Sequence, residues 1–259
     1  MIGDIKHIIV IQSLVNERLT GEEIYNDCIR RRIDYQNKLM THCLHNVDSK
    51  IQLVEILKYF QFNASLLTGG ILIHFEMHGD KNLDGLILSN GELIEWKELV
   101  ELFRPINITT CNKLFITMAT CNGRFLYKGV DPYLKSPYSG FISASIEVNN
   151  DEIVDKFSIL FEHLIENGNL VEAYLQMEKT ESNFYYKDSE RTFEESYEMT
   201  MSEFKNNKEY KDDFLKKVND TVKRNGKPEF DKETQELILK KVAEDMFNEQ
   251  KKAYLFIDC

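Results

Sequence analysis

Short apolar runs that alternate with helix-type patterns dominate the first two thirds of the chain. Each run is rich in β-branched or aromatic residues, as buried strands are. The runs lie at residues 7–12, 71–77, 114–118 and 141–148. Apolar positions at a spacing near 3.6, typical of amphipathic helices, occur at residues 48–60, 95–103 and 152–167. Because strands and helices alternate, we predict an α/β fold with a mostly parallel sheet flanked by helices on both faces.

The pattern changes after Leu170, where strand signals disappear and charged residues become dense. Helices are predicted at residues 190–206, 209–224 and 231–252. We therefore expect a domain at residues 1–180 and a helical C-terminal extension at residues 181–259. Either the core or another protein is expected to cover this extension. Pro105 is expected to limit the helix that begins near residue 95.

Composition excludes several classes of function. The formal net charge of −11 would repel a phosphate backbone, so we expect no nucleic-acid partner. No run reaches the ~20 apolar residues that span a bilayer, and the N-terminus lacks a signal-peptide pattern. We therefore expect a cytoplasmic protein with no membrane partner.

The 5 cysteines are odd in number, scattered and never arranged as Cys-x-x-Cys. This pattern favours reduced thiols over a disulfide framework or a structural zinc site. The cluster His42-Cys43-x-His45 has no second pair of ligands, so we expect no metal and no other cofactor. Cys121 differs from the other thiols because it follows a buried strand and precedes Asn122-Gly123, where the chain turns. Taken alone, a cysteine is more often a buried thiol that packs as a small hydrophobe.

A histidine ends another of the predicted strands. His78-Gly79 closes the run that begins at residue 71, and ligands of parallel sheets gather at the carboxyl ends of the strands. A neighbouring imidazole raises the thiolate fraction of a cysteine. The amides of Gly79 and Cys121 are candidate donors to a developing oxyanion. His74 shares a face with His78 but lacks the glycine and the strand-end position, so His78 is preferred.

Together these motifs resemble those of the caspase-like (clan CD) cysteine proteases, which include caspases, metacaspases, gingipains, separases and CHAT-domain proteases. Cys121 follows His78 by 43 residues, close to the ~50 of caspases. The segment 140–151 and the helix after it are similar to the CHAT pattern, and the resemblance covers about residues 5–180. It implies a caspase-like sheet in which Cys121 attacks the scissile carbonyl and His78 protonates the leaving amine. It also implies an oxyanion hole formed by the Gly79 and Cys121 amides.

The resemblance also implies where substrate binds. Caspases carry Gln-Ala before the cysteine, whereas this chain has Ala119-Thr120, so strict aspartate specificity is not implied. Ala119, Asn150 and Asp151 are the candidate substrate-binding residues. An acid at Asp151 would favour a basic residue in the substrate, and helix capping explains the same acid equally well.

We therefore expect a cysteine endopeptidase that cleaves a protein or peptide substrate. The resemblance further suggests a regulatory partner protein and a role in prokaryotic stress or antiviral defence. The alternative is a catalytically silent caspase-like scaffold that binds partners through its C-terminal helices.

Overall fold

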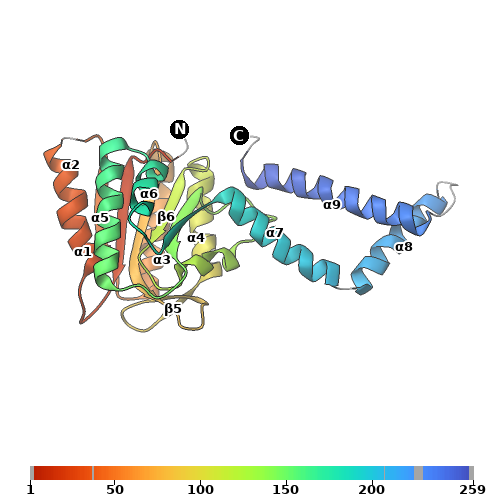
Figure 1. Cartoon of the computed structure of the whole chain (residues 1–259), viewed down its shortest axis with the longest axis horizontal. Coiled ribbons are helices and arrows are strands. Elements are labelled where there is room, and N and C mark those ends of the chain that lie inside the picture. The colour runs from red at the N-terminus through yellow and green to blue at the C-terminus, as the bar shows by residue number, and fades with distance from the viewer. Residues whose placement is uncertain (1–2, 37, 207, 225–229, 257–259) are drawn as a thin grey trace.

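A sheet of mostly parallel strands forms the centre of the molecule (Figure 1). The computed structural model describes residues 3–36, 38–206, 208–224 and 230–256. The strand order is β2-β1-β3-β6-β7-β8. Its parallel members are β1 (His7–Ser13), β2 (Thr41–Asn46), β3 (Ile71–Gly79), β6 (Leu114–Met118) and β7 (Gly140–Ala144). The short strands β4 (Gly85–Ile87) and β5 (Leu93–Glu95) form a hairpin that continues from the end of β3.

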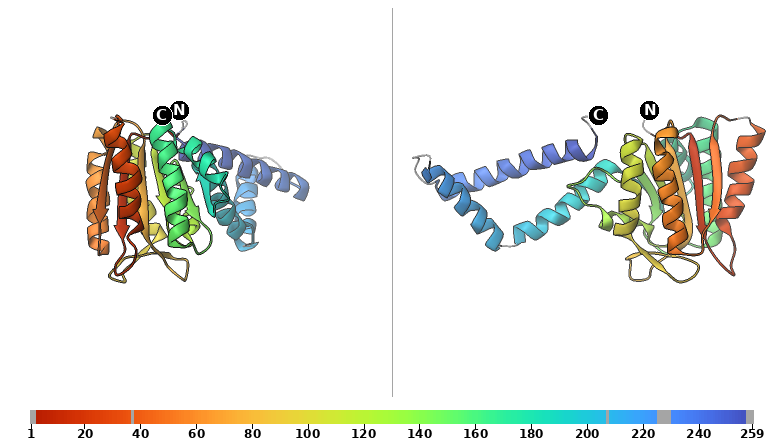
Figure 2. Two further views of the ribbon diagram at one scale, coloured as in Figure 1. Left: turned by 60° about the vertical axis from the view of Figure 1, so that its left-hand side comes forward. Right: turned by 180° about the vertical axis from the view of Figure 1, so that it is seen from behind.

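Helices cover both faces of the sheet, which confirms the predicted layers (Figures 1 and 2). One face carries α1 (Thr20–Ile24), the π-helical turn Tyr25–Arg30, α2 (Arg31–Tyr35), α5 (Asn150–Asn167) and α6 (Leu170–Glu178). The opposite face carries α3 (Lys50–Asn63), the 3-10 turn Ala64–Leu66 and α4 (Trp96–Thr109).

Alternation along β3 assigns each side chain to one of these faces. Ile73 and Phe75 belong to the apolar cluster under α3 and α4. Leu72 belongs to the cluster under α5, and the His74 ring lies 4.6 Å from that of Phe157 on α5. The side chains of the even-numbered residues of β3 therefore point toward the α5 side of the sheet, and His78 is one of these residues.

Side-chain caps explain where two of these helices begin. Ser49 accepts a hydrogen bond from the Gln52 amide at the start of α3, and Asn149 accepts one from the Glu152 amide at the start of α5. Gly168 ends α5 in the left-handed conformation, with φ of 78°.

The predicted end of α4 is wrong, because the helix continues past Pro105 to Thr109. Proline removes one backbone hydrogen bond. Phe103 and Ile106 on either side of it are fully buried, so their packing keeps the helix on the sheet.

The sequence pattern predicts no strand between Leu170 and the apolar segment 253–257, which is expected to dock as a short strand, and the first part of this prediction is wrong. β8 (Phe184–Asp188), inside the predicted helical extension, pairs antiparallel with β7 and adds an edge to the core sheet. Its signal is weak because it is short and only Phe184 of its residues is fully buried. The division of the chain into two domains stays a prediction.

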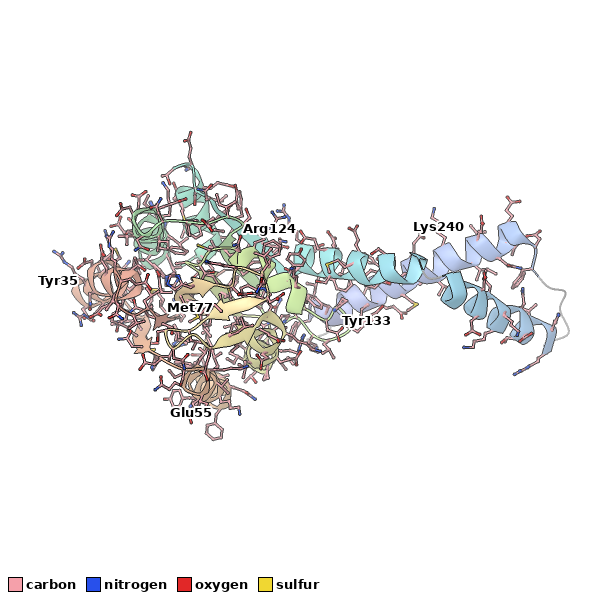
Figure 3. The ribbon with its side chains drawn as sticks, turned by 90° about the horizontal axis from the view of Figure 1, so that it is seen from below. Tyr35, Glu55, Met77, Arg124, Tyr133 and Lys240 are labelled. Carbon is pink, nitrogen blue, oxygen red and sulfur yellow. The ribbon has the colours of Figure 1, made fainter. Side chains whose placement is uncertain are left out.

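The helices predicted for the C-terminal third are confirmed as α7 (Ser189–Asn206), α8 (Lys208–Arg224) and α9 (Lys232–Tyr254). They form an arm that leaves the core and doubles back, so that α9 returns to the base of α7 (Figures 1 and 2). Figure 3 shows Tyr133 near this base and Lys240 far out on α9. The rings of Phe193, Phe247 and Tyr254 pack together where the two helices meet the core. No helix in the described ranges has the length and apolar character needed to cross a membrane.

Candidate active site

The carboxyl ends of β3 and β6 bring His78 and Cys121 next to each other in the sheet. Phe75 pairs with Met118, and the Ala119 amide donates to the Phe75 carbonyl over 2.9 Å. Continuing this register places His78 opposite Cys121. A Cβ atom on Gly79 would lie only 1.9 Å from the Cys121 carbonyl oxygen, so the two backbones are in close contact. Glycine is needed at this position for steric reasons.

The two side chains also point to the same face. Cys121 Sγ lies 3.9 Å from the carbonyl oxygen of Val148, just before α5, so the thiol is on the α5 side of the sheet. His78 lies on that face as well, because it continues the alternation of His74 along β3. The structure thus places His78 and Cys121 at the same edge of the sheet, where the backbone of Gly79 contacts that of Cys121.

Cys121 lies at a sharp turn beside the start of α5. Its side chain is partly buried, and Sγ is 3.9 Å from the Val148 carbonyl oxygen. Asn122 has a left-handed backbone, with φ of 59°, and its amide donates to the Ile146 carbonyl over 3.3 Å. The chain turns away from the direction of β6 here, so the Cys121 thiol lies at the edge of the sheet.

The two amides predicted to form the oxyanion hole, those of Gly79 and Cys121, can be described from the hydrogen bonds around them. The Asp80 amide donates to the Gly85 carbonyl on β4, so the preceding amide of Gly79 points to the other side, toward β6. Within the described residues, the Cys121 amide donates to no acceptor. Gly79 at the end of β3 and Cys121 in the turn after β6 are in backbone contact, and their two N–H groups stay the predicted oxyanion donors.

Glu17 is a residue of this site that the sequence pattern does not reveal. Its Oε1 atom lies 2.7 Å from Nε2 of His78, whose side chain is 58% exposed. Glu17 comes from the loop 14–19 between β1 and α1, which has no periodicity or motif. Only a contact map or a structure could have identified it.

The candidate substrate-binding residues differ in their placement. Ala119 is 3% exposed and packs in the core, so its side chain offers no surface to a substrate. Asn150 and Asp151 are exposed in the first turn of α5. Asp151 accepts a hydrogen bond from Arg18 over 2.6 Å, and the capping role falls to Asn149 instead.

His74, the alternative histidine, lies in a buried polar network. Its Nε2 is 2.9 Å from Glu76 Oε1, its Nδ1 is 2.8 Å from Thr117 Oγ1, and it has no exposed surface. Thr20 donates to the second oxygen of Glu76 over 2.7 Å. Because these groups bond one another inside the core, His74 has a structural role.

The second histidine cluster is also explained by local contacts. His42 Nδ1 is 2.9 Å from the Tyr25 hydroxyl, and its Nε2 is 3.5 Å from Asp34. Burial raises the pKa of the Cys43 thiol to about 11 and lowers the pKa of His45. Across the described part of the chain, no group of three His, Cys, Asp or Glu side chains is arranged to hold a metal ion.

Comparison with solved structures identifies the fold. The core is similar to the crystal structure of the Drosophila initiator caspase Dronc, with a TM-score of 0.51 and 10% sequence identity. The match covers 73% of this chain and 82% of that chain. At this identity the likeness shows the fold alone, and the fold is caspase-like α/β. Neither a protein-family model nor a curated protein matches the sequence.

Proposed function

We propose that this chain, which has a caspase-like α/β fold, is a cysteine endopeptidase that cleaves a protein or peptide substrate. One observation carries the proposal: Cys121 and His78 end adjacent parallel strands on the same face, and the Gly79 backbone contacts the Cys121 carbonyl. A thiol and an imidazole at the ends of adjacent strands support this proposal, because nucleophilic catalysis by cysteine needs a base near the thiol.

The proposed reaction proceeds through an acyl-enzyme. The Cys121 thiolate attacks the scissile carbonyl carbon, and the carbonyl oxygen takes negative charge opposite the Gly79 and Cys121 amides. When the C–N bond breaks, the His78 imidazolium gives its proton to the leaving amine. A water molecule then attacks the thioester, passes a proton to His78 and releases the carboxylic acid, which restores the thiolate and the imidazolium. These steps need no metal or organic cofactor.

Asn150 and Asp151 are the proposed substrate contacts. They follow directly after the segment whose Val148 carbonyl contacts the thiol, and both are exposed. The ion pair with Arg18 already balances the charge of Asp151. A basic substrate residue would therefore have to compete with Arg18 for this carboxylate.

An unbiased peptide-cleavage profile tests the proposal. Wild type is compared with Cys121→Ala and His78→Ala, and Cys111→Ala, which removes an exposed thiol, is the matched control. We expect cleavage to be lost in the first two variants and retained in the control. Equal cleavage by wild type and Cys121→Ala would show that another residue is the nucleophile.

The exposed surface of the arm favours a second candidate, a scaffold that binds a partner protein. Leu237 is 67% exposed, and Met246 and Met199 are about half exposed. Exposed apolar side chains that form a contiguous patch mark protein-binding surfaces, and these three are the candidates for such a patch on the arm. If a candidate partner protein binds wild type and Cys121→Ala equally, binding is weakened by Leu237→Glu, and no peptide is cleaved, the scaffold describes the protein better.

The biological setting is proposed from the family resemblance. We propose a cytoplasmic enzyme of prokaryotic stress or antiviral defence that a partner protein regulates. The free thiols of Cys28, Cys43, Cys111 and Cys121 support a reducing compartment. Phage challenge of bacteria that express wild type or Cys121→Ala tests the defence role, and equal survival of the two cultures would exclude one that depends on catalysis.

A further inference from the structure

The Glu17 carboxylate bonds to one nitrogen of the His78 ring and leaves the other free. Glu17 Oε1 is 2.7 Å from Nε2 of His78. A carboxylate accepts hydrogen bonds, so Nε2 carries the proton and donates it to Glu17. Nδ1 of His78 bonds to no group among the described residues. In the neutral ring Nδ1 therefore keeps the lone pair that can accept the thiol proton of Cys121.

The end of the loop 14–19 is fixed by buried contacts. Thr20, the first residue of α1, donates to Glu76 over 2.7 Å, and both side chains are 1% exposed. A Cβ atom on Gly21 would lie 2.7 Å from Cγ of Glu76, so α1 begins in direct contact with β3. The Glu22 amide donates to Gln12 of β1 over 2.9 Å. These contacts hold the start of α1 against two neighbouring strands.

The beginning and middle of the same loop are also held. Ser13 donates to the Val47 carbonyl over 2.7 Å. Arg18 donates to both carboxylate oxygens of Glu23, over 2.8 and 2.7 Å, and to Asp151 of α5 over 2.6 Å. Arg18 thus connects the residue next to Glu17 with both α1 and α5. Contacts at Ser13 and Thr20 therefore anchor both ends of the loop that places Glu17 beside His78.

The exposure of the pair indicates a role other than stability. The side chain of His78 is 58% exposed and that of Glu17 is 31% exposed. Ion pairs with this much solvent contact contribute little to folding. The same contact matters for catalysis because it fixes the tautomer and the orientation of a ring that must exchange protons.

From these contacts we infer that Glu17 is a positioning residue for His78, an inference that rests on the proposed function. Glu17 holds the proton on Nε2, turns Nδ1 toward Cys121 and stabilises the imidazolium that forms when the thiol gives up its proton. The proposed dyad therefore works as a triad of Cys121, His78 and Glu17. Glu17 itself touches neither the substrate nor the reacting atoms.

Alkylation of the full-length protein by iodoacetamide tests this inference without a substrate. The rate at each cysteine is followed by mass spectrometry in wild type, His78→Ala, Glu17→Gln and Glu17→Ala. Glu22→Gln is the matched control, since Glu22 lies near the same loop and bonds to Gln12 only through its backbone amide. Unfolding temperatures show that each variant is folded.

We expect Cys121 to react faster than the exposed Cys111 in wild type near neutral pH. In Glu17→Gln the Cys121 rate falls about tenfold, because the amide still accepts from Nε2 but no longer stabilises the imidazolium. It falls further in Glu17→Ala, which removes the acceptor too. At strongly alkaline pH the rates of all variants converge, because the thiol ionises there without the imidazolium. In peptide cleavage, kcat falls and KM stays constant.

The outcomes separate the two proposals. If Cys121 in wild type reacts no faster than Cys111, or does not depend on His78, the proposed function fails. If Cys121 is activated by His78 but both Glu17 variants match Glu22→Gln, the function stands and the positioning role is wrong. Faster alkylation in the Glu17 variants would also overturn the inference, because Glu17 would then be blocking the imidazole.

Discussion

Substitution of Gly79 by alanine is predicted to damage the site through a displacement that the structure defines. The new Cβ would lie 1.9 Å from the Cys121 carbonyl oxygen. To restore ordinary contact, the ends of β3 and β6 must separate by about 1.5 Å. A shift of about 1 Å in a catalytic group can cost on the order of a hundredfold in rate. We therefore expect kcat/KM for peptide cleavage to fall about a hundredfold, with a loss of roughly 1–3 kcal/mol in stability from overpacking.

Gly70→Ala is the matched control for this experiment. Its Cβ would lie 1.8 Å from the Asp4 carbonyl oxygen, an equally close backbone contact at the opposite end of β3. Both variants should lose similar stability in urea unfolding, and only Gly79→Ala should lose activity once rates are corrected for the folded fraction. Near-normal activity in Gly79→Ala, or an equal loss in Gly70→Ala, would refute the reasoning.

Three further predictions concern the rest of the core. Glu76→Ala should lower the free energy of unfolding by about 1–3 kcal/mol, since it leaves the buried polar groups of His74 and Thr20 without their hydrogen-bond partner; an unchanged urea midpoint would contradict this. Because burial raises the pKa of Cys43 to about 11, this thiol should resist iodoacetamide near neutral pH while Cys111 reacts. The stability that comes from keeping the buried Cys43 thiol protonated should be fully present below its ordinary pKa of 9.0 and should be lost as the pH rises toward about 11. Unfolding measured across this pH range tests the prediction. Phe193→Ala should cost about 3–5 kcal/mol and speed hydrogen exchange at the end of α9; unchanged exchange would show that this contact does not hold the arm.

The sequence predicts the sheet and the adjacent ends of the strands that carry His78 and Cys121, because both follow from short-range patterns. Buried strands produce continuous apolar runs, and helical connections make the strands parallel. Once the strands are parallel, residues at their carboxyl ends share one rim. A His-Gly pair at the end of one apolar run and a cysteine after another are then enough to predict where the candidate site lies.

The remaining contacts depend on tertiary packing between distant parts of the chain. Glu17 and His78 are separated by 61 residues, and the loop that carries Glu17 has no periodic signal. Arg18 and Asp151 are 133 residues apart. Because such pairs depend on how the loop 14–19 packs against α5 and β3, single-sequence patterns do not contain them. The strand β8 was missed for a related reason, since its pairing with β7 outweighs a weak local preference.

Covalent labelling with a peptidyl acyloxymethyl ketone tests the central claim most directly. The reagent transfers its peptidyl group to an activated thiol, and mass spectrometry identifies the labelled cysteine. We predict one adduct, on Cys121, that is absent from Cys121→Ala and strongly reduced in His78→Ala. Labelling at another cysteine, or an equal rate at Cys121 in His78→Ala, would contradict the proposal that these two residues form the catalytic centre.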